Sequence, residues 1–150
     1  MKMGWARHLL HTLAGTALVP ATVFAQPAVT SLRSLYVLHC AGCHAMDGSG
    51  HPDQGVPSMR GALGRFMTRP EGRAFLVQVP GVNSAGLSDT QIAALTNWMV
   101  QQFSPDTAPA GWAPYTADEV AAARRVRPAD VTQARAALVA RLPNAGQAQD

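Results

Sequence analysis

Residues 40–44 read Cys-Ala-Gly-Cys-His, and this stretch determines what fold and chemistry are expected of the chain. Cys40 and Cys43 are the only cysteines among the 150 residues, so a scaffold of several disulfides is excluded. The preceding residues 30–39 place apolar and aromatic side chains at helical spacing, and Thr30 or Ser31 is expected to cap the first turn. The two thiols and the imidazole therefore come together where a helix ends and a turn begins.

The order Cys-x-x-Cys-His is typical of the attachment site of c-type haem. Two thiols at this spacing reach the two vinyl groups of one porphyrin, and His44 then lies beneath the iron, where its Nε2 can coordinate. A redox-active dithiol needs a strand before the motif, a zinc site needs a second pair of ligands, and a disulfide would close a strained ring. The sequence favours one covalent haem c per chain, attached to Cys40 and Cys43.

The N-terminus has the features of a secretory signal peptide over residues 1–25. Lys2 and Arg7 give it a positive start, the segment that follows is mostly apolar, and cleavage is expected after Ala25. An uncleaved membrane anchor is the alternative, but Pro20 interrupts an apolar run that is already short for a bilayer. No transmembrane segment is expected after cleavage, and the predicted location is the periplasm.

Composition and charge exclude several classes of protein. Hydrophobic residues make up 47% and charged residues 14%, which fits one globular domain and not a disordered, collagen-like or coiled-coil chain. The formal charge of +3 falls to +1 when Lys2 and Arg7 are removed, and every remaining basic side chain is an arginine. Basic residues do not alternate with aromatic ones in any run, so no nucleic-acid partner is expected.

Residues 26–103 are expected to form a compact all-α unit of about three helices. After the helix that precedes Cys40, a second helix is predicted over 71–79, where a Pro-Gly pair ends it. The clearest helix runs over 87–103, and its start carries a capping box made by Ser88 and Gln91.

Two segments lack helical periodicity. Residues 46–64 are rich in Gly, Pro, Ser and Asp and are predicted to be an irregular loop. Residues 104–115 contain three prolines and are predicted to be a linker.

Residues 116–150 are expected to form a helical C-terminal extension. Thr116 and Glu119 have the spacing of a second capping box, which would open a helix over 117–126. A last helix is predicted over 129–142, and the final eight residues are expected to fray.

The chain resembles the class I mono-haem cytochromes c over about residues 30–103. The resemblance implies a cytochrome c-like, all-α domain around one haem, to which residues 104–150 are an addition. Four features carry it: the helix with Tyr36 that ends in Cys40-x-x-Cys43-His44, the turn Asp47-Gly48-Ser49-Gly50, the segment Pro57-Ser58-Met59-Arg60-Gly61-Ala62-Leu63-Gly64-Arg65, and the final helix that starts at Leu87-Ser88-Asp89 and contains Trp98.

The resemblance also assigns roles to single residues. The carbonyl of Pro57 would accept a hydrogen bond from Nδ1 of His44, which orients the ring and makes it a better donor to iron. Arg65 would lie near a haem propionate and offset its charge, the alternative being a solvated surface arginine. Trp98 would pack on the N-terminal helix near Tyr36.

The sixth iron ligand departs from the family pattern. Members that transfer electrons usually place a methionine in a loop shortly before the final helix, but residues 80–86 of this chain contain neither Met nor His. Met59 or Met67 is the first alternative, an iron without a sixth protein ligand is the second, and Asn83 is the third. Met99, beside Trp98, is expected to be a core residue.

The resemblance implies a periplasmic carrier of single electrons, with a dehydrogenase or an oxidase as its redox partner. Because the mature chain lacks lysine, an apolar docking patch is favoured over a lysine-rich one. One alternative is a haem protein that binds O₂, NO or CO, and another is the haem subunit of a larger periplasmic oxidoreductase. An enzyme acting alone is not expected, since motifs for a nucleophile or a phosphate loop are absent from the sequence.

Overall fold

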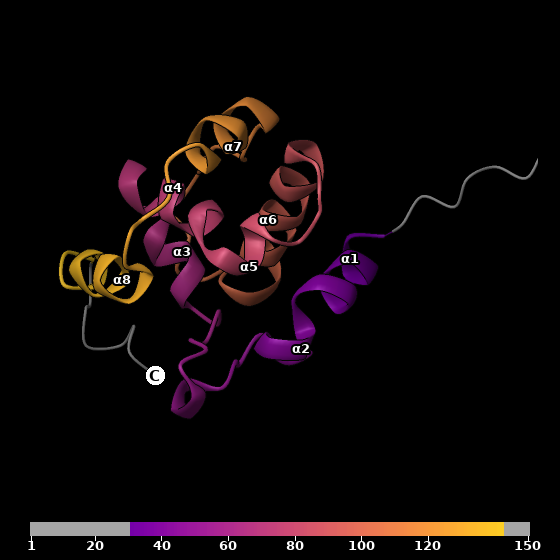
Figure 1. Ribbon diagram of the computed structural model, residues 1–150, viewed down its shortest axis with the longest axis horizontal. Helices are drawn as coiled ribbons and strands as arrows, with labels where there is room; N and C mark the ends of the chain where they lie inside the picture. Colours follow the sequence, from indigo (N-terminus) through magenta and orange to yellow (C-terminus); the bar gives the residue numbers. More distant parts are fainter. Residues whose placement is uncertain (1–30, 143–150) are drawn as a thin grey trace, which may run out of the picture.

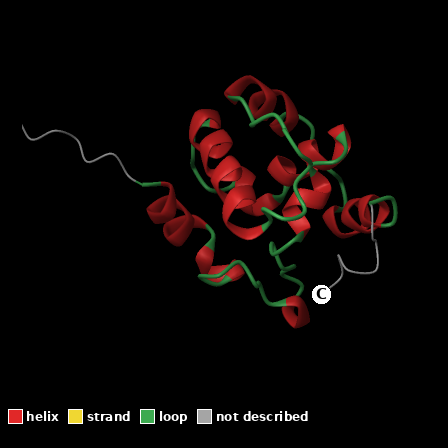
Figure 2. Ribbon diagram, turned by 180° about the vertical axis from the view of Figure 1, so that it is seen from behind, coloured by secondary structure: helices red, strands yellow, loops and turns green. Residues whose placement is uncertain are grey.

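The computed structural model describes residues 31–142, and within this range the chain is helical (Figures 1 and 2). Residues 31–142 form no β-strand, and His51 and Val56 make a single isolated bridge. The all-α prediction is confirmed for this part of the chain, whereas the predicted signal peptide over 1–25 and the predicted fraying of 143–150 lie outside it. The elements are α1 (Leu32–His39), α2 (Ala41–His44), η1 (Pro52–Gln54), α3 (Ala62–Phe66), α4 (Pro70–Gln78), α5 (Pro80–Asn83), α6 (Asp89–Phe103), α7 (Ala117–Arg124) and α8 (Val131–Val139).

Two helix starts follow directly from local sequence. The Ser31 hydroxyl accepts a hydrogen bond of 3.1 Å from the backbone N–H of Ser34 at the start of α1. At the start of α6, Ser88 and Gln91 satisfy each other's backbone N–H groups, so the predicted capping box is confirmed. Such caps depend on residues three positions apart, which is why sequence alone predicts them.

The region up to residue 103 contains more helices than the three that were predicted. Helix α3 begins at Ala62, inside the loop expected over 46–64, and the Pro-Gly pair that ends α4 also starts the short helix α5. Proline is well placed at the first position of a helix, because the N–H it lacks has no partner there. Each of these short helices makes about one turn. That is too short for a 3.6-residue repeat of apolar side chains to be recognised in the sequence.

Helix α1 packs across α6 through aromatic side chains. The ring of Tyr36 lies 5.6 Å from that of Trp98 and 5.1 Å from that of Phe103, measured between centroids. The predicted contact between Trp98 and the N-terminal helix is therefore confirmed. It fixes the end of α1, and with it the start of the Cys-x-x-Cys-His segment, against the longest helix of the chain.

The C-terminal extension packs on the same body. Helix α7 lies along α4 and α6 (Figure 1), and its Val120 is fully buried in one core cluster with Tyr36 and Met99. Helix α8 covers a second cluster around the stacked rings of Phe66 and Phe75, to which it contributes Leu138 and Val139. Leu142, which follows the helix, belongs to the same cluster.

Residues 104–115 form no helix, but they are packed and not extended away from the body. The Ser104 hydroxyl is buried and donates a hydrogen bond of 2.8 Å to the Met59 carbonyl. The backbone of residues 107 and 108 crosses Gly64 so closely that a Cβ there would lie 2.3 Å from the Ala108 nitrogen. This segment therefore joins α6 to α7 across the surface of α3.

Candidate haem site

The Cys-x-x-Cys-His segment forms one tight turn at the end of α1. The backbone N–H of Cys40 still bonds to the Tyr36 carbonyl at 2.8 Å, but its own ψ of −40° and φ of −129° end the helix. The N–H groups of Cys43 and His44 then both bond to the Cys40 carbonyl, at 3.2 and 2.9 Å. The two thiols and the imidazole thus project from a single short helix, α2 and its cap.

Both thiols are unpaired, and they differ in environment. Cys43 is exposed, whereas Cys40 is partly buried. Burial raises the pKa of the Cys40 thiol, and the neighbouring Cys43 adds to that rise. The plain disulfide considered from the sequence is not formed, and the segment presents one thiol to the interior and one to solvent.

The surroundings of His44 favour the neutral form of its imidazole. Burial lowers the pKa of its ring, the backbone carbonyl of Pro57 opposes that effect, and His51 adds to it. The Nδ1 atom of His44 is buried, and among residues 31–142 it has no hydrogen-bond partner of normal geometry. The Pro57 carbonyl is thus close enough to affect the ring without forming a well-aligned bond. The neutral form of an imidazole is the form that binds a metal through a ring nitrogen.

Gly50 makes this approach of Pro57 possible. Its φ of +68° lies in the left-handed region, and a Cβ at this position would lie 2.6 Å from the carbonyl oxygens of Val56 and Pro57. The N–H of Gly50 also bonds to the His44 carbonyl at 3.0 Å. The loop after His44 can therefore fold back under the imidazole only with glycine at residue 50.

An apolar cavity of about 20 Å³ lies beside Cys40. It has room for about one water molecule, far less than a porphyrin requires. Its walls come from residues 81–87 and from one face of α6: Gly81, Val82, Ala85, Leu87, Ile92, Leu95, Thr96 and Met99. The two unpaired thiols, the neutral imidazole and the apolar wall fit a covalently bound haem chemically, but a haem in this place requires the walls to stand further apart.

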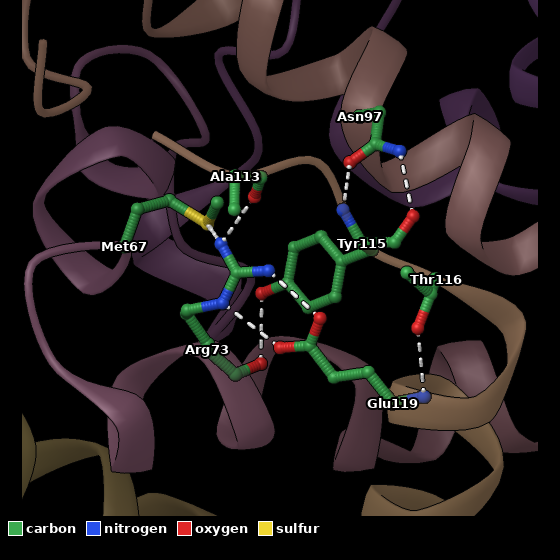
Figure 3. A network of polar contacts seen from close by, with 7 residues as sticks. All are labelled: Met67, Arg73, Asn97, Ala113, Tyr115, Thr116 and Glu119. Carbon is green, nitrogen blue, oxygen red and sulfur yellow. Dashed lines mark hydrogen bonds and ion pairs between the residues drawn. The ribbon is translucent and has the colours of Figure 1, made fainter. Parts of the chain in front are cut away.

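Of the methionines proposed as sixth ligand, Met67 lies away from this cavity. Its sulfur accepts a hydrogen bond of 3.8 Å from Nη1 of Arg73 (Figure 3). It borders a separate open hollow of about 510 Å³. Met59 is buried in the core, where Ser104 bonds to its carbonyl, and it does not line the cavity either. Neither of these two methionines lines the cavity beside Cys40.

The side-chain amide of Asn83 is committed to other partners. Its nitrogen donates to the Gln78 carbonyl at 2.8 Å, and its oxygen accepts from Nε of Arg124 at 3.3 Å. Arg65, the predicted propionate partner, donates from Nε to the Gly61 carbonyl at 3.1 Å. Neither residue lines the cavity beside Cys40.

Met99 occupies a place that sequence reasoning missed. It is buried, as expected of a core residue, but it also lines the cavity beside Cys40. Among the described residues of that lining, it carries the only sulfur besides the cysteine. The signal was present in the sequence, because Ile92, Leu95 and Met99 share one helical face.

Comparison with protein-family models, curated proteins and solved structures finds no match for the chain. Among the helices within residues 31–142, none has the length and apolar character that crossing a membrane demands.

Proposed function

We propose that the chain is an exported c-type cytochrome that transfers single electrons through one haem, attached to Cys40 and Cys43 with His44 as an axial ligand. The observation that carries the proposal is the combination, on one turn, of two unpaired thiols with an imidazole whose Nδ1 is buried and whose neutral form is favoured by burial. When bound, haem supplies an iron that alternates between the ferrous and ferric states.

The environment of the two cysteines suits an electron carrier. Cys40 faces an apolar wall, which keeps water from most of a group attached there. Cys43 is exposed, so the same group would have one edge at the protein surface. Electrons can then enter and leave at the exposed edge while the rest of the site stays dry.

Exposed apolar side chains that lie close to Cys43 in the sequence support a partner with an apolar docking face. Leu38 on α1 is 72% exposed, and Val37 and Met46 are also exposed large apolar residues. Exposed apolar side chains gathered near one feature often mark an interaction site. The proposed partner is a periplasmic dehydrogenase or oxidase.

Optical spectra of the purified exported protein test the proposal, taken oxidised and reduced and with and without CO. An electron carrier with six-coordinate iron gives a low-spin spectrum that CO leaves unchanged, and His44→Ala abolishes this spectrum. A protein without a haem band in either state contradicts the proposal.

A second function, binding of O₂, NO or CO, is favoured by one specific observation. Residues 81–87 contribute only apolar or glycine positions to the cavity wall, and Asn83 is held elsewhere by Gln78 and Arg124. If Met99 does not coordinate the iron, CO shifts the reduced spectrum at once. A Met99→Leu variant separates the two functions. If Met99 is the sixth ligand, the variant binds CO and the wild type does not; if it is not, both bind CO alike.

The third possibility, a haem subunit of a larger oxidoreductase, was motivated by residues 104–150. Val120 and Leu138 of this extension are buried against the body of the same chain. The described part of the extension therefore completes its own core, and this favours the independent carrier.

A further inference from the structure

The segment between α7 and α8 is an exposed connection that contains two arginines. It runs over residues 125–130, and Arg125, Val126 and Arg127 are all exposed, Val126 to 67%. Within the described residues 31–142, the side chains of Arg125 and Arg127 form no hydrogen bond or ion pair. Exposed connections of this kind are where proteases cut a folded chain.

The connection suits an endoprotease that cleaves after arginine, and one bond is favoured. The bond between Arg127 and Pro128 resists such enzymes, because the proline nitrogen lies in a ring and carries no hydrogen. Arg124 belongs to the last turn of α7, and α6 binds its guanidinium, so this side chain is withheld from the enzyme. The Arg125–Val126 bond remains.

This bond joins the part of the chain that forms the larger hydrophobic cluster to the helix that covers the smaller one. On its N-terminal side, α7 is buried in the larger cluster through Val120. On its C-terminal side, α8 packs on α4 (Figure 1) and buries Leu138 and Val139 against the stacked rings of Phe66 and Phe75. A cut at this bond leaves the larger cluster complete.

Polar contacts hold α7 to the body ahead of the bond. Glu119 accepts two hydrogen bonds of 2.8 Å from Arg73 (Figure 3), and the Ala123 carbonyl accepts one of 3.0 Å from Gln78. A cleaved chain therefore keeps α7 in place. Helix α8 loses its covalent link, so a contact with an effective concentration on the order of millimolar becomes one between two separate molecules.

We propose that the Arg125–Val126 bond is a processing site for an arginine-specific endoprotease, and that its cleavage releases α8 and uncovers the stacked rings of Phe66 and Phe75. Hydrolysis consumes one water molecule and leaves a carboxyl group on Arg125 and an amino group on Val126. None of these residues lines the cavity beside Cys40, so the inference is independent of the proposed function.

Cleavage requires the last turn of α7 to open. A protease binds several residues on each side of the bond in extended form, whereas Arg124 is helical and its Nη1 donates to Oδ1 of Asp89 at 2.6 Å. The Arg124 side chain is only 20% exposed, so water screens this ion pair weakly. When opening is fast relative to cutting, the cleavage rate follows the population of the open form. The Arg124–Asp89 pair therefore controls that rate.

Limited digestion of the full chain with trypsin, followed by intact mass, tests the site. The first product is expected to end at Arg125. Arg125→Gln should abolish this product, and Arg127→Gln, a change at the other exposed and unpaired side chain of the connection, should leave it. A first cut at Arg33, Arg60 or Arg141, which are also exposed, overturns the proposal.

The rate of that cut tests the opening step with a matched pair of variants. Asp89→Asn should accelerate it on the order of tenfold, the factor that corresponds to weakening one charge-assisted hydrogen bond. Glu71→Gln is the control, because Glu71 also lies in the first turn of a helix but pairs with Arg69 on the exposed surface, at 3.7 Å. Equal acceleration by both variants, or none by Asp89→Asn, overturns the role of the Arg124–Asp89 pair.

Gel filtration of the cleaved chain at micromolar concentration tests the release of α8. The larger fragment should elute without the smaller one, unfold cooperatively in denaturant, and bind the apolar dye ANS more strongly than the intact chain. Co-elution of the two fragments overturns the release. Loss of cooperative unfolding in the larger fragment overturns it as well, because α8 would then be required for the fold itself.

Discussion

The Tyr36 hydroxyl donates a hydrogen bond of 2.6 Å to the carbonyl of Ala45, the residue that follows the Cys-x-x-Cys-His segment. Tyr36 is almost fully buried and also contacts Trp98. One side chain therefore connects the α1–α6 packing to the far end of the candidate haem site. The geometry of Cys40, Cys43 and His44 depends on both attachments.

Tyr36→Phe should lower the free energy of unfolding by about 1–2 kcal/mol, because it leaves the Ala45 carbonyl without its partner while keeping the ring contacts. Denaturant unfolding of the two proteins measures the difference. If Tyr36→Phe has the same free energy of unfolding as the wild type, this hydrogen bond does not hold the turn.

Ala45→Gly should raise the stability by about 1 kcal/mol. Ala45 has φ of 60° and ψ of 168°, a region that glycine adopts far more readily than alanine. Relief of this strain outweighs the greater freedom of glycine in the unfolded chain. Denaturant unfolding checks the result, and a less stable variant would mean that the alanine methyl group contributes more than the strain costs.

Gly64→Ala should lower the stability by at least about 2 kcal/mol and loosen residues 104–115. A Cβ there would meet the Ala108 nitrogen at 2.3 Å and the Thr107 backbone at 2.6 Å, so the backbone of the joining segment must shift. Unfolding and limited proteolysis measure the two effects. Gly42→Ala is the matched control, since nothing lies within 4 Å of its added Cβ, and equal loss in both variants would argue against the contact.

Alkaline pH should destabilise the fold through its two tyrosines. Burial, followed by Cys40 and Asp47, raises the pKa of Tyr36 to about 12, and burial also raises the pKa of Tyr115. An unfolded tyrosine loses its proton near pH 10, so above that pH the folded chain binds more protons than the unfolded one. The contribution of the protonated tyrosines to the free energy of unfolding is therefore fully present below about pH 10. It is lost as the pH rises from about 10 to about 12. Tyrosinate absorbance that rises near pH 10 in the folded protein would contradict this.

Sequence alone predicted those parts of the fold that depend on neighbouring residues. The Ser88–Gln91 capping box is one example, since both partners lie within a single turn. The second capping box formed only in part: Thr116 caps the N–H of Glu119, but the Glu119 carboxylate binds Arg73 instead. That competitor lies 46 residues away, and no local spacing indicates it.

The same reason explains what could be predicted of the site. The roles proposed for Cys40, Cys43 and His44 follow from adjacent positions in the sequence. The surroundings of Met99 and Asn83 depend on which distant helices meet them, α1 in one case and α7 in the other. The lining of the cavity and the contact of Asn83 with Arg124 therefore became visible only in the folded chain.

Covalent attachment of haem at Cys40 and Cys43 is the proposal on which the other functional inferences depend. The most direct measurement is the intact mass of the exported chain, produced in a bacterium that matures c-type cytochromes and then denatured to remove any non-covalent ligand. The account predicts an increase of one haem per chain, loss of thiol reactivity at both cysteines, and no covalent haem in a Cys40→Ala, Cys43→Ala double variant. A wild-type chain at its unmodified mass, with two reactive thiols, would contradict it.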